Sequence, residues 1–187
     1  MSMQGVRMPT EALVRRRMPL EDYLGLSDDV RAEYVDGVAI VTPRASMPHN
    51  EVGARMLMLL RASLSGVHVG FEMGLHLPDD SRRIPDIAVV DRLEDTLFTR
   101  QIPHLVVEVL SPSTRSEDTL RKSVDYQRAG IGQYWIVDRD NRAVVVHGNT
   151  GVGWELLLEL DAGRPRGEVA VAEYGVVVLD RDELLSL

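Results

Sequence analysis

The sequence predicts an α+β fold in which a mixed β-sheet core is flanked by helices. Two apolar runs, residues 84–90 and 105–110, have the nearly continuous Val, Ile and Leu content of central strands. The strands expected along the chain come in groups and do not alternate strictly with helices, which favours a mixed sheet over a purely parallel one. A chain of 187 residues is also long enough to bury a substantial core in one domain.

The N-terminal residues 1–17 are polar and mixed, with three consecutive arginines from Arg15 to Arg17. A basic arm is one interpretation of this segment. Because chain ends are commonly poorly ordered, we instead expect a flexible N-terminal segment over 1–17 and a single domain over 18–187.

Helices and strands are expected throughout that domain. Helical spacing of apolar residues predicts a helix over 50–65, and Gly66 fits the glycine that often follows a helix. Asp36-Gly37 predicts the turn of a hairpin. In a later helix, over 117–129, the spacing of Leu120, Val124 and Ala129 is expected to turn one side to the core. The other segments expected are helices at 19–24 and 180–187 and strands at 31–35, 38–41, 67–72, 75–77, 134–137, 142–147, 154–160, 168–171 and 176–179.

Composition excludes several classes of protein. The absence of cysteine rules out disulfides, thiolate metal sites and cysteine nucleophiles. No apolar run approaches the roughly 20 residues that span a bilayer, and the first 18 residues lack the apolar core of a signal peptide, so we expect a cytoplasmic protein without a membrane anchor. A net charge of −8 opposes non-specific adhesion to nucleic acid, but not an enzyme whose acidic site is masked by metal ions.

Each apolar run contains one carboxylate, Asp86 in the first and Glu108 in the second. A buried charge is costly unless it is paired or binds a metal. If the two strands are neighbours, the carboxylates converge at one end of the sheet, where a hard divalent cation would relieve their repulsion. Oxygen ligands without cysteine favour Mg²⁺ or Mn²⁺. Lys122, on the following helix, can point back over the same end, and Tyr126 shares its helix face.

These residues belong to an ordered series of motifs. The series comprises Arg83-Ile-Pro-Asp86, Leu105-Val-Val-Glu108-Val-Leu-Ser-Pro-Ser-Thr, Lys122, Tyr126, Gly130 and Tyr134-Trp-Ile-Val-Asp138, preceded by Glu33 four residues before Gly37 and by His49 at a helix start. This series resembles the Uma family of restriction endonucleases, which belongs to the PD-(D/E)XK nuclease superfamily. The resemblance covers the chain from about residue 19 to residue 147.

The resemblance implies a restriction-endonuclease-like fold and a Mg²⁺-dependent enzyme that hydrolyses DNA. Asp86 and Glu108 would then be metal-binding carboxylates, with the backbone carbonyl of Val109 as a further ligand. Glu33 would be an accessory carboxylate, and Lys122 would stabilise the developing phosphorane charge or help to deprotonate the attacking water.

The chain departs from the family pattern at two positions. The superfamily's lysine usually lies two residues after the second acid, where this chain has Leu110, so the lysine role passes to Lys122. Gln133 stands where the family commonly has Glu before Tyr-Trp, which keeps the hydrogen-bonding shape but loses the charge.

Structural roles are an alternative for several of these residues. Asp86 can cap a strand or pair with Arg82 or Arg83. Lys122 can be a solvated helix lysine, and His49 can cap or pack at its helix start.

Three functions therefore remain open. The first is a Mg²⁺-dependent DNA endonuclease, and the second is an inactive nuclease-fold protein that binds nucleic acid or a protein partner. The third is a metal-dependent hydrolase of a smaller phosphoester. An acidic domain has little basic surface with which to hold a duplex, so we also expect a two-fold homodimer that uses strands after Tyr134.

Overall fold

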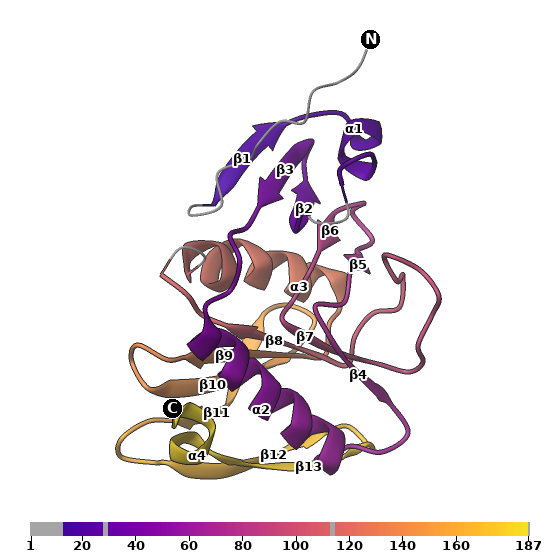
Figure 1. The fold of residues 1–187 in the computed structure, drawn as a ribbon. Coiled ribbons are helices and arrows are strands. Elements are labelled where there is room, and N and C mark those ends of the chain that lie inside the picture. Colours follow the sequence, from indigo (N-terminus) through magenta and orange to yellow (C-terminus); the bar gives the residue numbers. More distant parts are fainter. Residues whose placement is uncertain (1–12, 28–29, 113–114, 187) are drawn as a thin grey trace.

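The computed structural model describes residues 13–27, 30–112 and 115–186 (Figure 1). Its largest sheet has six strands, in the spatial order β11 (Trp154–Leu160), β10 (Ala143–Asn149), β9 (Gln133–Asp138), β8 (Leu105–Val109), β7 (Ile87–Val90) and β4 (His68–Phe71). A five-stranded sheet has the order β1 (Val14–Arg17), β3 (Val38–Val41), β2 (Ala32–Val35), β6 (Arg82–Arg83) and β5 (Leu75–His76). A separate pair consists of β12 (Arg166–Val171) and β13 (Gly175–Asp180).

The helices are α1 (Leu20–Leu24), α2 (Met47–Ser63), a π-helical turn η1 (Glu117–Lys122) that continues into α3 (Ser123–Ala129), and α4 (Arg181–Leu185). Helix α2 and the η1–α3 segment pack against the large sheet, whereas Tyr23 of α1 packs against the small sheet. In Figure 1, α3 lies between the five-stranded and six-stranded sheets, whereas α2 lies toward the β12–β13 pair. The predicted mixed sheet flanked by helices is confirmed, and no helix among the described residues is long and apolar enough to cross a membrane.

The parallel pair in the large sheet determines where α3 lies. Strands β8 and β9 are parallel, whereas the other neighbouring pairs of this sheet are antiparallel. A parallel pair needs a crossover connection, which is usually helical. Here η1 and α3 form that crossover, and Tyr126 of α3 packs with Ala88 and Val106 on one face of the sheet.

The opposite face of the sheet is apolar. Side chains of β7 and β8, including Ile87, Leu105 and Val107, pack there with Val52 and Met56 of α2. These residues are completely buried. At about 25 cal/mol per Å² of apolar surface removed from water, this contact is a main source of folding free energy.

Strand β1 corrects the prediction of a flexible segment over residues 1–17. Val14–Arg17 pairs with β3 in an antiparallel register from Val14↔Val41 to Arg17↔Val38. Backbone pairing along an open sheet edge orders these residues despite their polarity. Residues 1–12, Ser113 and Thr114 of the motif series, and Leu187 of the last expected helix lie outside the described residues.

The boundaries of helix α2 and strand β7 show why the observed elements differ from the predicted ranges. Helix α2 begins three residues early, because Ser46 accepts a hydrogen bond from the His49 backbone N–H, and it ends at Ser63, before an extended Leu64. Strand β7 begins at Ile87, after Pro85, which has no N–H to donate. The Asp36-Gly37 turn is confirmed, with positive φ at both residues.

Candidate active site

Asp86 and Glu108 meet at the end of the β7–β8 pair. Ile87 pairs with Val107 in the antiparallel register, so the next position outward sets Asp86 opposite Glu108. Residues that are directly opposite in an antiparallel pair point to the same face. Both carboxylates are buried and lie on the face that α3 covers. The expected convergence of these two side chains is therefore present.

Lys122 lies between two carboxylates over this end of the sheet. Its Nζ is 3.0 Å from Glu108 Oε1 and 3.0 Å from Glu33 Oε1. Only 3% of Lys122 is exposed, and Glu33 and Glu108 are each 1% exposed, so all three charges are removed from water. The alternative of a solvated helix lysine is wrong, because burial of an ammonium group requires the paired partners seen here.

The π-helical turn brings polar residues to the buried side of the helix. Residues five apart are joined by one turn of a π-helix, whereas in an α-helix they lie about 140° apart. Glu117 and Lys122 are five apart, and both are buried. The prediction of the core-facing side is wrong for Leu120 and Val124, which are 67% and 45% exposed, whereas Ala129 packs against the cluster that contains Tyr126. The apolar character of Leu120 and Val124 misled the prediction because ion pairs decide which side of this helix is buried.

Asp86 is held by three donors. Its Oδ2 accepts a hydrogen bond of 2.8 Å from the Val109 backbone N–H and lies 3.3 Å from His49 Nε2, while Oδ1 lies 3.5 Å from Arg31 Nη2. Pairing of Asp86 with the neighbouring arginines of β6, one of the structural alternatives, is therefore wrong. Burial raises the pKa of Asp86, but the His49 hydrogen bond and the nearby cations outweigh burial and lower it overall. The carboxylate stays ionised.

His49 is a site residue whose side chain the sequence did not place. It lies in the first turn of α2, where its backbone N–H is capped by Ser46, and its buried ring faces Asp86. Burial lowers the pKa of His49. The hydrogen bond to Asp86 and the charge of that carboxylate, together with a hydrogen bond to the Val109 backbone, outweigh burial, so the pKa is raised overall. The Ser46 cap thus fixes the start of the helix at His49, and the His49 side chain positions a site carboxylate.

Glu33 in β2 uses both of its oxygens. Oε1 accepts a 2.8 Å hydrogen bond from the Ile84 backbone N–H as well as the Lys122 ion pair, and Oε2 accepts a 2.8 Å bond from Arg83 Nη1. Burial raises the pKa of Glu33, but Lys122 and Arg83 outweigh burial, so the pKa is lowered overall. Glu33 therefore remains an anion that holds the lysine.

Tyr126 completes the surroundings of Glu108. Its hydroxyl donates a 2.7 Å hydrogen bond to the same Oε1 atom that receives Lys122. Burial and the Glu108 charge raise the pKa of Tyr126 well above its normal value, so the phenol keeps its proton and remains a donor.

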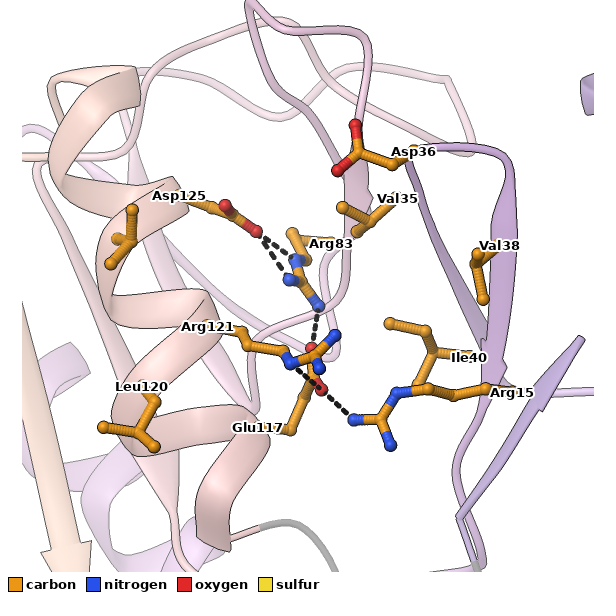
Figure 2. Close-up of a pocket in the computed structure, with 11 residues that line it drawn as sticks. Arg15, Val35, Asp36, Val38, Ile40, Arg83, Glu117, Leu120, Arg121 and Asp125 are labelled. Atoms are coloured by element: carbon orange, nitrogen blue, oxygen red, sulfur yellow. Dashed lines mark hydrogen bonds and ion pairs between the residues drawn. The ribbon is translucent and has the colours of Figure 1, made fainter. Parts of the chain in front are cut away.

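A second buried cation, Arg83, lies behind Glu33. Figure 2 shows its guanidinium between Asp125 and Glu117, both contributed by the η1–α3 segment. Arg83 Nη1 is 2.9 Å from Glu117 Oε1, and Arg83 Nε is 2.9 Å from Asp125 Oδ2. On the outer side, Arg15 of β1 donates to Glu117 Oε2, and Arg121 Nε lies 3.8 Å from the same atom.

A pocket of about 390 Å³ opens onto this cluster between the η1–α3 segment and the β1–β3 side of the small sheet (Figure 2). The residues that line it combine charged groups with an apolar wall: Arg15, Val35, Asp36, Val38, Ile40, Arg83, Glu117, Leu120, Arg121, Val124 and Asp125. The pocket therefore reaches the cluster from the side opposite Glu108.

One signal in the sequence marks the lysine. The chain has 20 arginines but a single lysine, Lys122, and that lysine is buried. The one lysine side chain of the protein therefore lies in the site, whereas its other basic side chains, apart from histidine, carry guanidinium groups. No comparable signal marks Arg31 or Glu117, and the motif that contains Arg83 does not indicate its partners, because these contacts join distant segments.

Gln133 lies outside the site. Its Nε2 donates to the Ala170 carbonyl at 2.8 Å, and its Oε1 accepts from Trp135 Nε1 at 2.9 Å. The residue joins β9 to the β12 strand, so the loss of charge at this position leaves the carboxylate cluster unchanged.

Comparison with known proteins agrees with this geometry. Residues 20–172 match the Uma2 family, whose description is "Putative restriction endonuclease". The chain belongs to the Uma2 family. The match includes Glu33, Asp86, Glu108 and Lys122, and it extends beyond the stretch on which the resemblance in the sequence rested. A comparison with curated proteins finds no match.

A solved structure shares the fold of this Uma2 family member. It is the crystal structure of a protein from Anabaena variabilis described as "a putative nuclease belonging to DUF820". The two chains are 20% identical, the match covers 89% of this chain and 97% of the other, and the TM-score is 0.71. The restriction-endonuclease-like mixed sheet flanked by helices is thus the fold of this chain.

Proposed function

We propose that this protein is a Mg²⁺-dependent endonuclease that hydrolyses DNA phosphodiester bonds, with Mn²⁺ as an alternative metal. The observation that carries the proposal is the single lysine, buried 3.0 Å from both Glu33 and Glu108 at the sheet end that also holds Asp86. Membership in a family of restriction endonucleases supports a nuclease and favours DNA as the substrate.

The donor set suits a hard divalent cation. Asp86 and Glu108 offer carboxylate oxygens and Val109 a backbone carbonyl, which are ligand types that Mg²⁺ prefers. Among the described residues, no group of three or more His, Asp and Glu side chains is arranged to hold a metal. Mg²⁺ sites commonly use one or two carboxylates together with water and substrate phosphate, so two carboxylates suffice.

Different residues of the site would have different roles in the reaction. Bound Mg²⁺ would polarise the scissile phosphate and lower the pKa of a bound water. His49, Arg31 and the Val109 N–H orient Asp86 toward the site. Lys122 is placed to donate to a phosphate oxygen as negative charge develops on it.

Burial strengthens this electrostatic arrangement. Leu110 occupies the position of the usual superfamily lysine and is only 3% exposed. Its apolar side chain excludes water from the strand end, which lowers the local dielectric and strengthens the interaction of Lys122 with nearby anions. Glu33 would retain Lys122 while Glu108 binds metal.

Cleavage of supercoiled plasmid DNA in the presence of Mg²⁺ or Mn²⁺ tests the proposal. We expect cleavage that stops when the metal is chelated and that is lost in Asp86→Ala. Asp22→Ala, at an exposed acid on α1, is the matched control and should cleave normally. Folded wild-type protein that fails to cleave DNA under these conditions would favour the inactive, binding-only alternative. Preference for a nucleotide monoester over DNA would favour the small-phosphoester alternative.

The expected homodimer and cytoplasmic location are further parts of the proposal. Two strands after Tyr134 carry exposed apolar side chains, which support an interface there. These side chains are Leu156 and Leu157 of β11 and Val176 and Val178 of β13. Light scattering at high protein concentration should give about twice the chain mass of 20.9 kDa, and a monomer mass would contradict a dimer.

A further inference from the structure

The cluster behind Glu33 contains more acid than its buried arginine can neutralise. Arg83 is 1% exposed and contacts three carboxylates, those of Glu33, Glu117 and Asp125. Burial lowers the pKa of Arg83, but Glu33 and Asp125 outweigh burial and raise it overall, so the guanidinium stays charged. One positive charge is thus shared among three acids, and the remaining negative charge requires other cations.

Those other cations lie at the two ends of the cluster. Lys122 pairs with Glu33 at the inner end, and Arg15 pairs with Glu117 at the outer end. Positive and negative groups therefore alternate from the pocket in Figure 2 to Glu108. The charge of Glu33 is thus neutralised by Arg83 and Lys122 together.

Glu33 contacts both Arg83 and Lys122, so it links the two cations. Arg83 occupies Glu33 Oε2, while Oε1 receives both Lys122 and the Ile84 backbone N–H. A carboxylate fixed at both oxygens can hold an ammonium group in one place, although lysine otherwise has a long, flexible stem.

The π-helical turn η1 connects the two ends of this set of contacts, because it contains both Glu117 and Lys122. Arg83 also binds Glu117, which begins the π-helical turn that ends at Lys122. Residues five apart are brought to one side of the helix only by such a turn. The contact between Arg83 and Glu117 therefore favours the backbone geometry that directs Lys122 toward Glu33 and Glu108.

We propose that Arg83 is a positioning residue, which fixes the ammonium group of Lys122 beside Glu108 through its contacts with Glu33 and Glu117. The consequence for catalysis rests on the proposed function, whereas the consequence for the position of Lys122 does not. Lysine cannot replace arginine here, because only the planar fork of guanidinium donors can serve three carboxylates together.

The single lysine allows a direct spectroscopic test. Protein grown with lysine labelled with ¹⁵N at Nζ has one side-chain signal, which needs no assignment. In the wild type, the ammonium group is buried and paired with Glu33 and Glu108, so it should give a signal protected from exchange with water. Arg83→Met should shift and broaden this signal.

Arg82→Met is the matched control. Arg82 is the preceding residue in β6 and is also buried, but it donates to the backbone carbonyls of Asp80 and Ser81. The Lys122 signal should be unchanged in this variant. An identical signal in Arg83→Met and the wild type, or an unprotected signal in the wild type, would overturn the proposal.

A kinetic measurement adds the consequence for catalysis. Arg83→Met should lower kcat on the order of 100-fold, the effect of a catalytic group displaced by about 1 Å, with little change in KM. If Arg83→Met does not fold, Glu117→Gln provides the test, since it keeps the shape of the side chain but weakens the contact with Arg83. A wild-type Lys122 signal and kcat in Glu117→Gln would overturn the proposal. If the wild type does not cleave DNA, the proposed function fails, and the spectra alone decide the position of Lys122.

Discussion

On one face of the β7–β8 pair, Ile87 and Val107 pack into the apolar cluster under α2, whereas the opposite face ends in Asp86 and Glu108 beneath the η1–α3 segment. Apolar burial stabilises the fold without directional requirements. Buried charges lose their hydration, and a buried ion pair is weak evidence for stability. Two faces of the same strands therefore serve different purposes, one for folding and the other for the site.

The two helices that cover these faces differ in the same way. Helix α2 buries Val52, Met56 and Leu60. The η1–α3 segment buries Glu117 and Lys122 and leaves Leu120 and Val124 exposed. A helix that turns charges inward must be held by specific partners. Substitutions on the two faces should accordingly separate effects on catalysis from effects on stability.

Replacement of the lysine should have the largest effect. Lys122→Met should reduce metal-dependent DNA cleavage on the order of a hundred- to a thousandfold, because one preorganised charge is lost from the transition state. Metal binding and the folded structure should persist. Plasmid cleavage rates measure the loss, and Arg121→Met, at the exposed neighbouring residue, should cleave at nearly the wild-type rate. Equal rates for Lys122→Met and the wild type would contradict the role of the lysine.

A substitution on the apolar face should show the opposite pattern. Leu105→Ala removes a fully buried side chain and should lower the free energy of unfolding by about 2–5 kcal/mol. Mn²⁺ affinity and the cleavage rate of the folded protein should change little. Denaturant unfolding and calorimetric Mn²⁺ titration measure the two quantities, with Glu108→Gln as the counterpart that should weaken metal binding sharply. Loss of Mn²⁺ affinity in Leu105→Ala would show that the faces are not separable.

A smaller effect is expected from pH. The pKa of Glu33 is lowered in the folded protein from an ordinary value of 4.5, so between the two values the unfolded chain binds more protons. The stabilisation is complete above about pH 4.5 and is lost as the pH falls through the folded pKa. In Glu33→Gln the decline of unfolding free energy below pH 4.5 should be shallower. Glu155→Gln, at an exposed glutamate of β11, is the control, and equal slopes in Glu33→Gln and wild type would contradict the assignment.

The central strand, its buried carboxylate and the position of the lysine could be predicted from the sequence. The run from Leu105 to Leu110 predicted a central strand, because a strand that is buried on both faces needs apolar side chains at nearly every position. Glu108 stood out within it for the same reason. The position of Lys122 followed from the crossover helix, which must pack against the strand that precedes it.

The ion pairs of the polar cluster around Arg83 could not be predicted from the sequence. Glu117 and Arg31 are ordinary charged residues in the sequence, and the contacts of Arg83, Glu117 and Arg31 join segments that are 34 to 55 positions apart. Hydrophobic periodicity places apolar residues inside, so it chose the wrong side of the η1–α3 segment. It also contains no information on π-helical turns, which here depend on tertiary contacts.

The central claim is that Asp86 and Glu108 form a metal site beside a fixed lysine. A crystal of the wild-type protein soaked in Mn²⁺ tests this most directly, because the anomalous signal locates the ion. The account predicts Mn²⁺ between the two carboxylates, with Lys122 still paired with Glu33. Full Mn²⁺ occupancy elsewhere, or no ion at saturating Mn²⁺ with Lys122 still bridging Glu33 and Glu108, would contradict it.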